Sequence, residues 1–220
     1  MNDLTVIMLT PNLVPKKWAQ FHKQKLLEAI GDTPLITVSK KTLDWGHNII
    51  QEEYSLLNIY KQMLRAAEIA TTPWIAMADD DTLYPRQHFE YRPKQEGYFY
   101  HLNRWHMFTW GEPIYFHKPM QGNGLLLATR ELVVKALAKR FAHGDNLPPQ
   151  AHHELGTRRD MLEQDLVKST TFYLREPVLS FYHDYSFDEQ TKRHRKRMWP
   201  VRAYDIPIWG KAADIRQKFI

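Results

Sequence analysis

Apolar residues in the first eighty positions alternate between short continuous runs and segments with helical spacing. The runs at 4–10, 34–39 and 74–78 are too short for helices and predict buried strands. Residues 17–30 and 48–70 repeat apolar side chains three and four positions apart, which predicts two amphipathic helices. Such alternation is typical of an α/β domain, in which helices flank both faces of a mostly parallel central sheet.

The pattern is less regular in the second half of the chain. Residues 97–110 are rich in aromatic side chains and predict strands with a turn at Asn103. Helices are predicted at about 130–140 and 159–168. A single strand is predicted over 171–182, and it completes the body of the domain.

Length and composition favour one globular domain. The chain has 220 residues, 43% of them hydrophobic and 13% aromatic, which suits one large core. We expect this domain to span 1–183, with 184–220 as a basic C-terminal extension, a short helix and then irregular chain, packed on it. No apolar run approaches the ~18 residues of a membrane span, no signal-peptide pattern is visible, and cysteine is absent. These features favour a cytoplasmic protein without disulfides or cysteine-bound zinc.

Three carboxylates follow the third predicted strand. The apolar run that begins at Trp74 ends at Asp79, Asp80 and Asp81, and ligands of parallel sheets bind at the carboxyl ends of strands. In an extended segment Asp79 and Asp81 share one face, and adjacent carboxylates repel one another unless a cation is present. The cluster therefore predicts a site for Mg²⁺ or Mn²⁺ that also contacts substrate phosphates. The alternative is a solvated acidic turn.

A glycine pair, Gly122-Asn123-Gly124, follows the acids and leads into an apolar segment and a predicted helix. This order of motifs over residues 4–183 resembles the GT-A fold glycosyltransferases, especially the family 2-like inverting enzymes, in which an Asp-X-Asp motif stands at the position of the acids. The resemblance implies a GT-A-like (Rossmann-like) sheet. It also implies a donor-binding site formed by Thr10, Asn12, Asp44, Asp79, Asp80, Gly122, Asn123 and Gly124. The acidic element that usually follows the second strand is missing, and Asp44 is the acid left to reach the nucleotide base.

Later residues extend the resemblance. Glu163 and Asp165 look like the Glu-Asp element that supplies the catalytic base in these enzymes, and His183 is similar to a late histidine that completes metal coordination. The resemblance implies a UDP- or GDP-sugar donor and inversion at the transferred sugar. It also implies Mn²⁺ or Mg²⁺ bound by Asp79, Asp81 and His183.

Helical geometry favours one of the two acids as the base. At ~100° per residue, Asp165 falls within the apolar arc of the predicted helix, whereas Glu163 lies at its edge. Burial against a cavity wall raises the pKa of a carboxyl group, as a general base requires. We therefore expect Asp165 to be the base and Glu163 to be the second candidate; the alternative is that Asp165 pairs with an arginine such as Arg158.

The chain is modestly basic, with a net charge of +5. Much of the excess lies in one run, which contains Lys192, Arg193, Arg195, Lys196 and Arg197. Such a run is either a solvated face or a contact for a polyanion. It would suit a phage-type enzyme that glycosylates modified bases in DNA, through phosphate contacts; otherwise a saccharide or lipid-linked acceptor is the default expectation.

Two other functions compete with glycosyl transfer. A nucleotidyltransferase uses acids and a metal in a similar way, but it usually has a glycine-rich loop after the first strand, and residues 10–17 contain no glycine. A non-catalytic nucleic-acid-binding protein would use the basic run alone. Its binding would be salt-sensitive and would survive the loss of Asp79 and Asp81.

Overall fold

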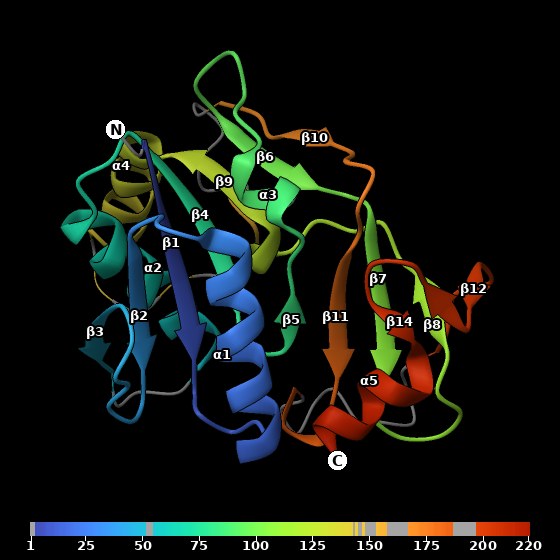
Figure 1. The fold of residues 1–220 in the computed structure, drawn as a ribbon. Coiled ribbons are helices and arrows are strands. Elements are labelled where there is room, and N and C mark those ends of the chain that lie inside the picture. Colours follow the sequence, from blue (N-terminus) through green and yellow to red (C-terminus); the bar gives the residue numbers. More distant parts are fainter. Residues whose placement is uncertain are drawn as a thin grey trace.

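A computed structural model confirms the predicted fold class, a mixed α/β architecture around a large, mainly parallel sheet with helices on both faces (Figure 1). It describes residues 3–51, 55–142, 144, 147, 153–157, 167–186 and 197–220. The seven strands of this sheet have the order β10-β6-β9-β4-β1-β2-β3. In that order they span Thr170–Phe172, Tyr98–His101, Leu126–Thr129, Trp74–Asp79, Leu4–Thr10, Leu35–Ser39 and His47–Ile50. Neighbours are parallel except where β9 pairs with β4 and β6.

Helices pack on the two faces of this sheet because each has one apolar side. On one side α1 (Lys16–Ile30) contacts α3 (Arg86–Glu90) and α5 (Ala212–Phe219). On the other side α2 (Leu56–Ile69) contacts α4 (Arg130–Phe141), and Figure 1 shows this pair behind the sheet. No helix within the described ranges is long and apolar enough to cross a membrane.

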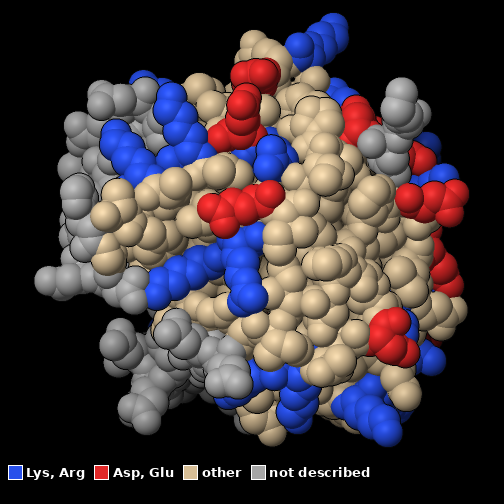
Figure 2. Space-filling view, turned by 90° about the vertical axis from the view of Figure 1, so that its left-hand side faces the viewer, with Lys and Arg blue, Asp and Glu red and all other residues tan. Residues whose placement is uncertain are grey.

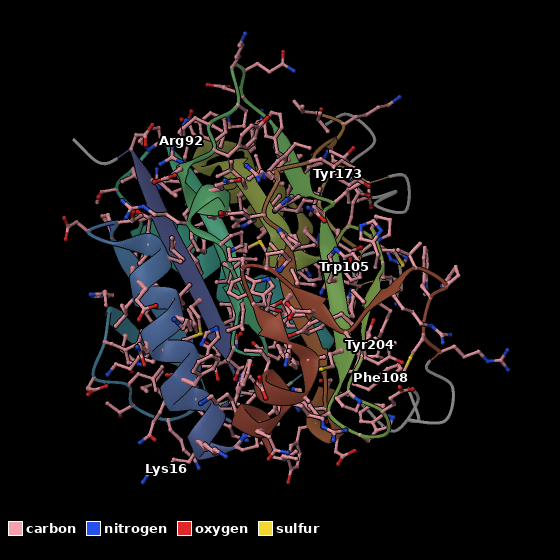
Figure 3. All side chains as sticks on the ribbon, turned by 45° about the vertical axis from the view of Figure 1, so that its right-hand side comes forward. Lys16, Arg92, Trp105, Phe108, Tyr173 and Tyr204 are labelled. Atoms are coloured by element: carbon pink, nitrogen blue, oxygen red, sulfur yellow. The ribbon has the colours of Figure 1, made fainter. Side chains whose placement is uncertain are left out.

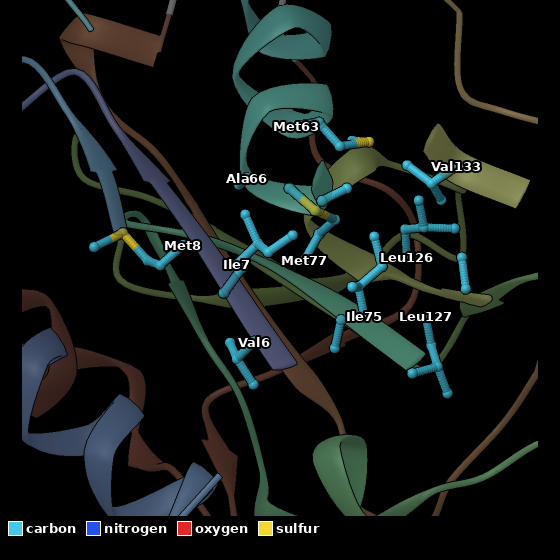
Figure 4. Packing of buried hydrophobic residues seen from close by; sticks show 14 of the residues in the cluster. Val6, Ile7, Met8, Met63, Ala66, Ile75, Met77, Leu126, Leu127 and Val133 are labelled. Carbon is cyan, nitrogen blue, oxygen red and sulfur yellow. The ribbon is translucent and has the colours of Figure 1, made fainter. Parts of the chain in front are cut away.

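The main core lies between the sheet and the α2–α4 pair. Figure 4 shows Met63 and Ala66 of α2 facing Ile7 and Met77 of the central strands, with Val133 of α4 closing the far side. All five side chains are 0% exposed. Truncating a buried side chain of this size to alanine usually costs about 2–5 kcal/mol, so this packing fixes β1 and β4 as the rigid centre of the fold.

A second sheet of five strands adjoins the first, in the order β12-β8-β7-β11-β5. In that order its strands span Arg202–Ala203, Tyr115–His117, Arg104–Phe108, Val178–Tyr182 and Thr82–Leu83. Its apolar face packs on α5 and on Trp18 of α1. The chain passes from β4 of the first sheet to β5 of the second through Asp80 and Asp81, so the acid cluster lies at the junction of the two sheets.

Several predicted elements match the structure closely. The first strand is β1, the first helix is α1, and Gly31 ends that helix with a positive φ of 56°. The second strand is β2 and the third is β4. The helix predicted at about 130–140 is α4.

The helix predicted from residue 48 is wrong over its first turns. Residues 47–50 form strand β3, which pairs in parallel with β2, and the helix α2 begins only at residue 56. Asn48 donates hydrogen bonds to the side chains of Thr37 and Ser39 on β2, and Ile49 is 6% exposed. Ser55 caps the helix by accepting a bond from the Asn58 amide. Pairing with β2 therefore overrides the helical spacing here.

Two further expectations are corrected. The strand predicted over 171–182 is two strands in different sheets, since β10 pairs with β6 and β11 pairs with β7. The C-terminal chain, expected to be irregular, forms regular elements within 197–220: β12 pairs with β8, β13 (Asp205–Ile206) and β14 (Gly210–Lys211) pair with each other, and α5 follows. These pairings join segments far apart in sequence, which local periodicity does not register. The short helix expected in the basic run lies outside the described residues.

Candidate active site

The three acids stand at the carboxyl end of a strand whose interior is closed to water. Residues 75–78 of β4 are 0% exposed, whereas Asp79, Asp80 and Asp81 are half-buried. Asp79 ends the strand, and the other two lie in the turn before β5. Because Asp80 and Asp81 lie beyond the strand, the alternation of side chains along β4 does not decide which way their carboxylates point; their hydrogen bonds and packing contacts do.

Asp80 faces the end of β1. Its carboxylate accepts a hydrogen bond from the Thr10 hydroxyl, and its backbone carbonyl accepts one from the Trp18 indole at 2.7 Å. Burial, then the charge of Asp81, raises the pKa of Asp80 to about 8, and the bond from Thr10 offsets only part of the shift. Asp80 is therefore poised to give up a proton when a cation approaches.

Asp79 is held against the glycine pair. The hydroxyl of Tyr84 accepts a bond from the Asp79 amide at 2.9 Å and donates one to the Gly124 carbonyl at 2.8 Å. A Cβ on Gly124 would lie 2.0 Å from Asp79 Oδ2, so this position requires glycine. Burial, then the charge of Asp81, raises the pKa of Asp79, and the nearby Arg104 opposes the shift.

Asp81 faces the second sheet. Its Oδ1 accepts a bond from the Thr82 hydroxyl at 3.0 Å, and its Oδ2 lies 3.6 Å from His183 Nε2. His183 follows β11 and is 6% exposed. Among the described residues, its Nδ1 has no hydrogen-bond partner. Asp81 and His183, separated by a hundred positions in the sequence, thus meet at one point.

A pocket of about 350 Å³ opens beside Asp80, at the ends of β1 and β2. It is lined by Met8, Thr10, Asn12, Val14, Lys16, Ala19, His22, Lys41, Leu43, Trp45 and Asp80. Its wall is shaped by Asn12, which has a positive φ of 57°, donates its amide proton to Thr10 Oγ1 and accepts a bond from the Lys41 amide. Burial lowers the pKa of His22 to about 4 against the opposing charge of Asp81, so His22 is neutral near pH 7. The lining of the pocket thus includes the indole-bearing Trp45, two lysines (Lys16 and Lys41) and the carboxylate-bearing Asp80.

The structure brings most of the predicted donor residues together but not Asp44. The carboxylate of Asp44 is 85% exposed and pairs with Lys23 at 2.8 Å, which lowers its pKa. Its neighbours Leu43 and Trp45 line the pocket instead. Trp45 was not predicted as a pocket residue, although it is an aromatic residue within the polar loop, two positions before β3.

The glycine pair approaches side chains of the chain itself. Gly124 faces Asp79, and a Cβ on Gly122 would lie 2.7 Å from Arg104 Nη1. Between them Asn123 has a buried Oδ1 without a hydrogen-bond partner in the described part of the chain. Arg104 was not predicted, because an arginine at the start of an aromatic-rich strand gives no indication of its distant neighbours.

The predicted catalytic and most of the predicted polyanion residues are not part of the described structure. Glu163, Asp165, Lys192, Arg193, Arg195 and Lys196 all lie outside the described residues. Arg197 begins the last described segment and is exposed. The assignments of the catalytic base and of the basic run stay predictions.

Within the described ranges, no group of three or more His, Asp or Glu side chains is arranged to hold a metal ion. Two donors do converge, since Asp81 Oδ2 lies 3.6 Å from His183 Nε2, and the Nδ1 of the same histidine has no hydrogen-bond partner in the described segments. Mg²⁺ usually takes one or two carboxylates and completes its shell with water and substrate phosphates. The donor set therefore fits an ion that binds together with a phosphorylated ligand.

No protein-family model and no curated protein sequence matches this chain. Among solved structures, it is similar to the bifunctional IspDF from Campylobacter jejuni, with a TM-score of 0.47 and 10% identity over 80% of this chain and 50% of that one. Thus the chain spans half the length of that bifunctional protein. It is also similar to a glycosyltransferase involved in the glycosylation of the major capsid of PBCV-1, with a TM-score of 0.46 and 12% identity over 80% and 92% of the two chains.

The inositol-1-phosphate CTP transferase from T. maritima gives a TM-score of 0.48 and 10% identity over 86% of this chain and 93% of that one. Likenesses at TM-scores below 0.5 are too loose to assign an activity to this chain. The site must therefore be interpreted from its own residues.

Proposed function

We propose that this chain is a metal-dependent glycosyltransferase that moves a sugar from a nucleotide-diphosphate donor to an acceptor hydroxyl. One observation supports this most strongly: the pocket at the ends of β1 and β2 meets Asp80, the middle one of three adjacent carboxylates at the end of β4. Ligands of open α/β sheets bind in this position. The pocket suits a nucleoside, since Trp45 offers a ring for stacking and Lys41 a positive charge near the phosphates.

The carboxylates on the far side of Asp80 suit the diphosphate and its counter-ion. We assign Mn²⁺ or Mg²⁺ to Asp81 and His183, whose Oδ2 and Nε2 lie 3.6 Å apart, with Asp79 as a third candidate ligand. When bound, the ion neutralises the negative charge that develops on the departing diphosphate. Tyr84 fixes the backbone at Asp79, and Thr10 fixes the carboxylate of Asp80, so both groups are held in place before the donor binds.

The acceptor hydroxyl must lose a proton to a base. Asp165 remains the expected base, with Glu163 as the second candidate, from their helical spacing and from the family resemblance. Replacing each in turn by its amide separates them, because loss of the base lowers turnover while the donor still binds.

DNA is the acceptor that we propose for this reaction. The net charge is +5, and in the described segment Arg197 and Arg202 are exposed next to Trp199, whose side chain is 38% exposed. Figure 2 shows that, on the edge of the molecule at β3 and α2, basic and acidic side chains are interspersed. The C-terminal segment is therefore the surface that we assign to DNA. Transfer to DNA should fall steeply between low and moderate salt, whereas donor hydrolysis should not; equal salt dependence would favour a saccharide or lipid-linked acceptor.

The chemistry itself is tested by product analysis. UDP- and GDP-sugars are incubated with the protein and Mn²⁺, and release of the nucleoside diphosphate is measured with and without acceptor. We expect Mn²⁺-dependent release that is lost in Asp81→Asn. Release of pyrophosphate from a nucleoside triphosphate, with no release from the sugar nucleotides, would establish nucleotidyl transfer instead, since the same site geometry serves both reactions.

A further inference from the structure

A chain of buried hydrogen bonds connects Arg104 of the second sheet to the acid cluster. Arg104 Nε donates to Ser180 Oγ at 3.0 Å, Ser180 Oγ lies 3.0 Å from Thr82 Oγ1, and Thr82 Oγ1 lies 3.0 Å from Asp81 Oδ1. Thr82 and Ser180 are 1% and 2% exposed, so water does not compete for these hydroxyls. We call the four side chains the Arg104 relay.

Each hydroxyl has only one proton to donate, so the hydrogen bonds of the Arg104 relay all run in one direction, from Arg104 towards Asp81. The carboxylate of Asp81 can only accept hydrogen bonds, so the hydroxyl of Thr82 uses its single proton to donate one to Asp81 Oδ1. The contact between the two hydroxyls must then use the proton of Ser180, which accepts in turn from Arg104. Arg104 is thus fixed by its Nε, while Asp81 is fixed by its Oδ1 and keeps Oδ2 facing His183.

The terminal nitrogens of Arg104 point to the site rather than to a carboxylate partner. Nη1 lies against Gly122, where any Cβ would come within 2.7 Å, and the guanidinium is near enough to Asp79 to lower its pKa. Among the described residues, no Asp or Glu forms an ion pair with Arg104, and its one side-chain hydrogen bond there runs from Nε to Ser180 Oγ. Gly122 thus leaves space for a guanidinium whose terminal nitrogens, within the described part of the chain, form no ion pair with a carboxylate.

We propose that the terminal nitrogens of Arg104 bind an oxyanion of the donor, a phosphate or carboxylate group, on the side of the acids away from the nucleoside pocket. A planar guanidinium held by Nε presents its remaining N–H groups in the fork that recognises such groups. The pocket and Arg104 then hold opposite ends of one ligand, with Asp79, Asp80 and Asp81 between them. The inference rests on the proposed function, because it assumes a nucleotide-diphosphate donor.

A simpler role for Arg104 is to offset the charge of the acids. The two roles predict effects of opposite sign. If Arg104 only offsets charge, Arg104→Gln should bind Mn²⁺ alone more tightly and should leave nucleotide affinity unchanged or improved. If Arg104 binds the donor, Arg104→Gln should bind the nucleotide more weakly even when Mn²⁺ is saturating.

The experiment is calorimetric titration of UDP and GDP in saturating Mn²⁺ into wild type, Arg104→Gln and Arg104→Lys. We expect Arg104→Gln to weaken binding roughly tenfold to a hundredfold, as for the loss of hydrogen bonds to a charged group. Arg104→Lys keeps the positive charge but not the paired N–H groups of the guanidinium, so its nucleotide affinity should lie between those of wild type and Arg104→Gln. Lys118→Gln is the matched control. The backbone amide of Lys118 bonds the Arg104 carbonyl, but its side-chain Nζ donates to the Tyr182 hydroxyl at 2.8 Å. The Lys118→Gln variant should therefore bind the nucleotide as tightly as wild type.

UDP-glucose and UDP-glucuronic acid distinguish the two sources of the oxyanion. A loss already present with UDP assigns the oxyanion to the diphosphate. A loss confined to UDP-glucuronic acid assigns it to a carboxylate on the transferred sugar. Equal affinity of wild type and Arg104→Gln for all of these ligands would overturn the inference and leave the proposed function intact, whereas failure of wild type to bind any nucleotide would overturn both.

Discussion

The two sides of the acid cluster are built by different kinds of contact. On the side of the first sheet, β1, β2 and β4 run in parallel, and Thr10, Asn12 and Asp80 meet because these strands end together. On the side of the second sheet, Arg104 and Ser180 come from β7 and β11, and His183 follows β11. The first side follows from sequence-local elements, whereas the second depends on which distant strands pair. Half of a site can therefore be predicted from pattern alone, and the other half only from topology.

The largest effect is expected from the proton that Asp80, on the first side, retains in the folded chain. Asp80 has an ordinary pKa of 3.8 and a folded pKa of about 8, so between these values the folded chain keeps a proton that the unfolded chain releases. Stability then falls as pH rises, by up to about 1.4 kcal/mol per pH unit, and the loss is complete above pH 8. Asp80→Asn should lack this slope, because its amide does not titrate.

The measurement is urea unfolding of both proteins from pH 4 to pH 9. The difference in free energy of unfolding between them isolates Asp80, since His22 and the other titrating groups are common to both. Parallel curves for the two proteins would show that the pKa of Asp80 is the same in the folded and unfolded chains, which would contradict this prediction.

Substitution of the glycine pair compares the two sides directly. Gly124→Ala places a Cβ 2.0 Å from the carboxylate of Asp79 beside the Tyr84 bonds, whereas Gly122→Ala meets only the end of the Arg104 side chain. We expect Gly124→Ala to lower the free energy of unfolding by about 3 kcal/mol, the upper part of the usual range for overpacking, and to abolish nucleotide binding. Gly122→Ala should unfold close to wild type but bind nucleotide more weakly. Thermal unfolding and calorimetry measure both, and equal behaviour of the two variants would contradict this difference.

A smaller effect is expected from breaking the Arg104 relay in the middle. Thr82→Val keeps the shape of the side chain and removes the hydrogen bonds that residue 82 makes with Asp81 Oδ1 and Ser180 Oγ, which should cost about 1–3 kcal/mol of unfolding free energy. Thr5→Val is a control in the first sheet, since Thr5 bonds Thr72 near the start of β1, at the opposite end of the strand from Thr10. Both variants should be destabilised, but only Thr82→Val should weaken Mn²⁺-dependent nucleotide binding.

The smallest effect is expected at Asp44. Its carboxylate is exposed and, among the residues that the structure describes, pairs with Lys23 alone at the surface; such pairs contribute little. Asp44→Asn should leave both the melting temperature and nucleotide affinity unchanged. Clear loss of nucleotide affinity in this variant would restore the role in base recognition that the family resemblance implied.

The limits of prediction from sequence follow from the same difference. Asp79, Asp80 and Asp81 were predicted as a site because a buried strand leads directly into them. Arg104 could not be predicted in this way, because its partner Ser180 is 76 residues away and the two join only through the pairing of β7 with β11. His183 was named from a family resemblance rather than from its spacing.

Two secondary-structure elements were predicted wrongly for a related reason, because long-range strand pairing cannot be seen in the local sequence. The apolar residues near 47–50 have a spacing compatible with a helix, but the hydrogen bonds of Asn48 to β2 and the pairing of the two segments stabilise a strand instead. The strand expected over 171–182 divides because its two parts pair with different sheets. Where one residue pattern fits two structures, long-range pairing makes the choice.

The most direct test of the central claim is a thermal-shift screen of UDP, GDP, CDP and ADP, with and without Mn²⁺, on wild type and Asp81→Asn. A ligand at a hundredfold excess over its Kd stabilises the folded state by roughly 2.7 kcal/mol. We predict a Mn²⁺-dependent rise in Tm with one of these nucleotides, and its loss in Asp81→Asn. No rise with any nucleotide, or the same rise in both proteins, would contradict a metal-dependent nucleotide site at the junction of the two sheets.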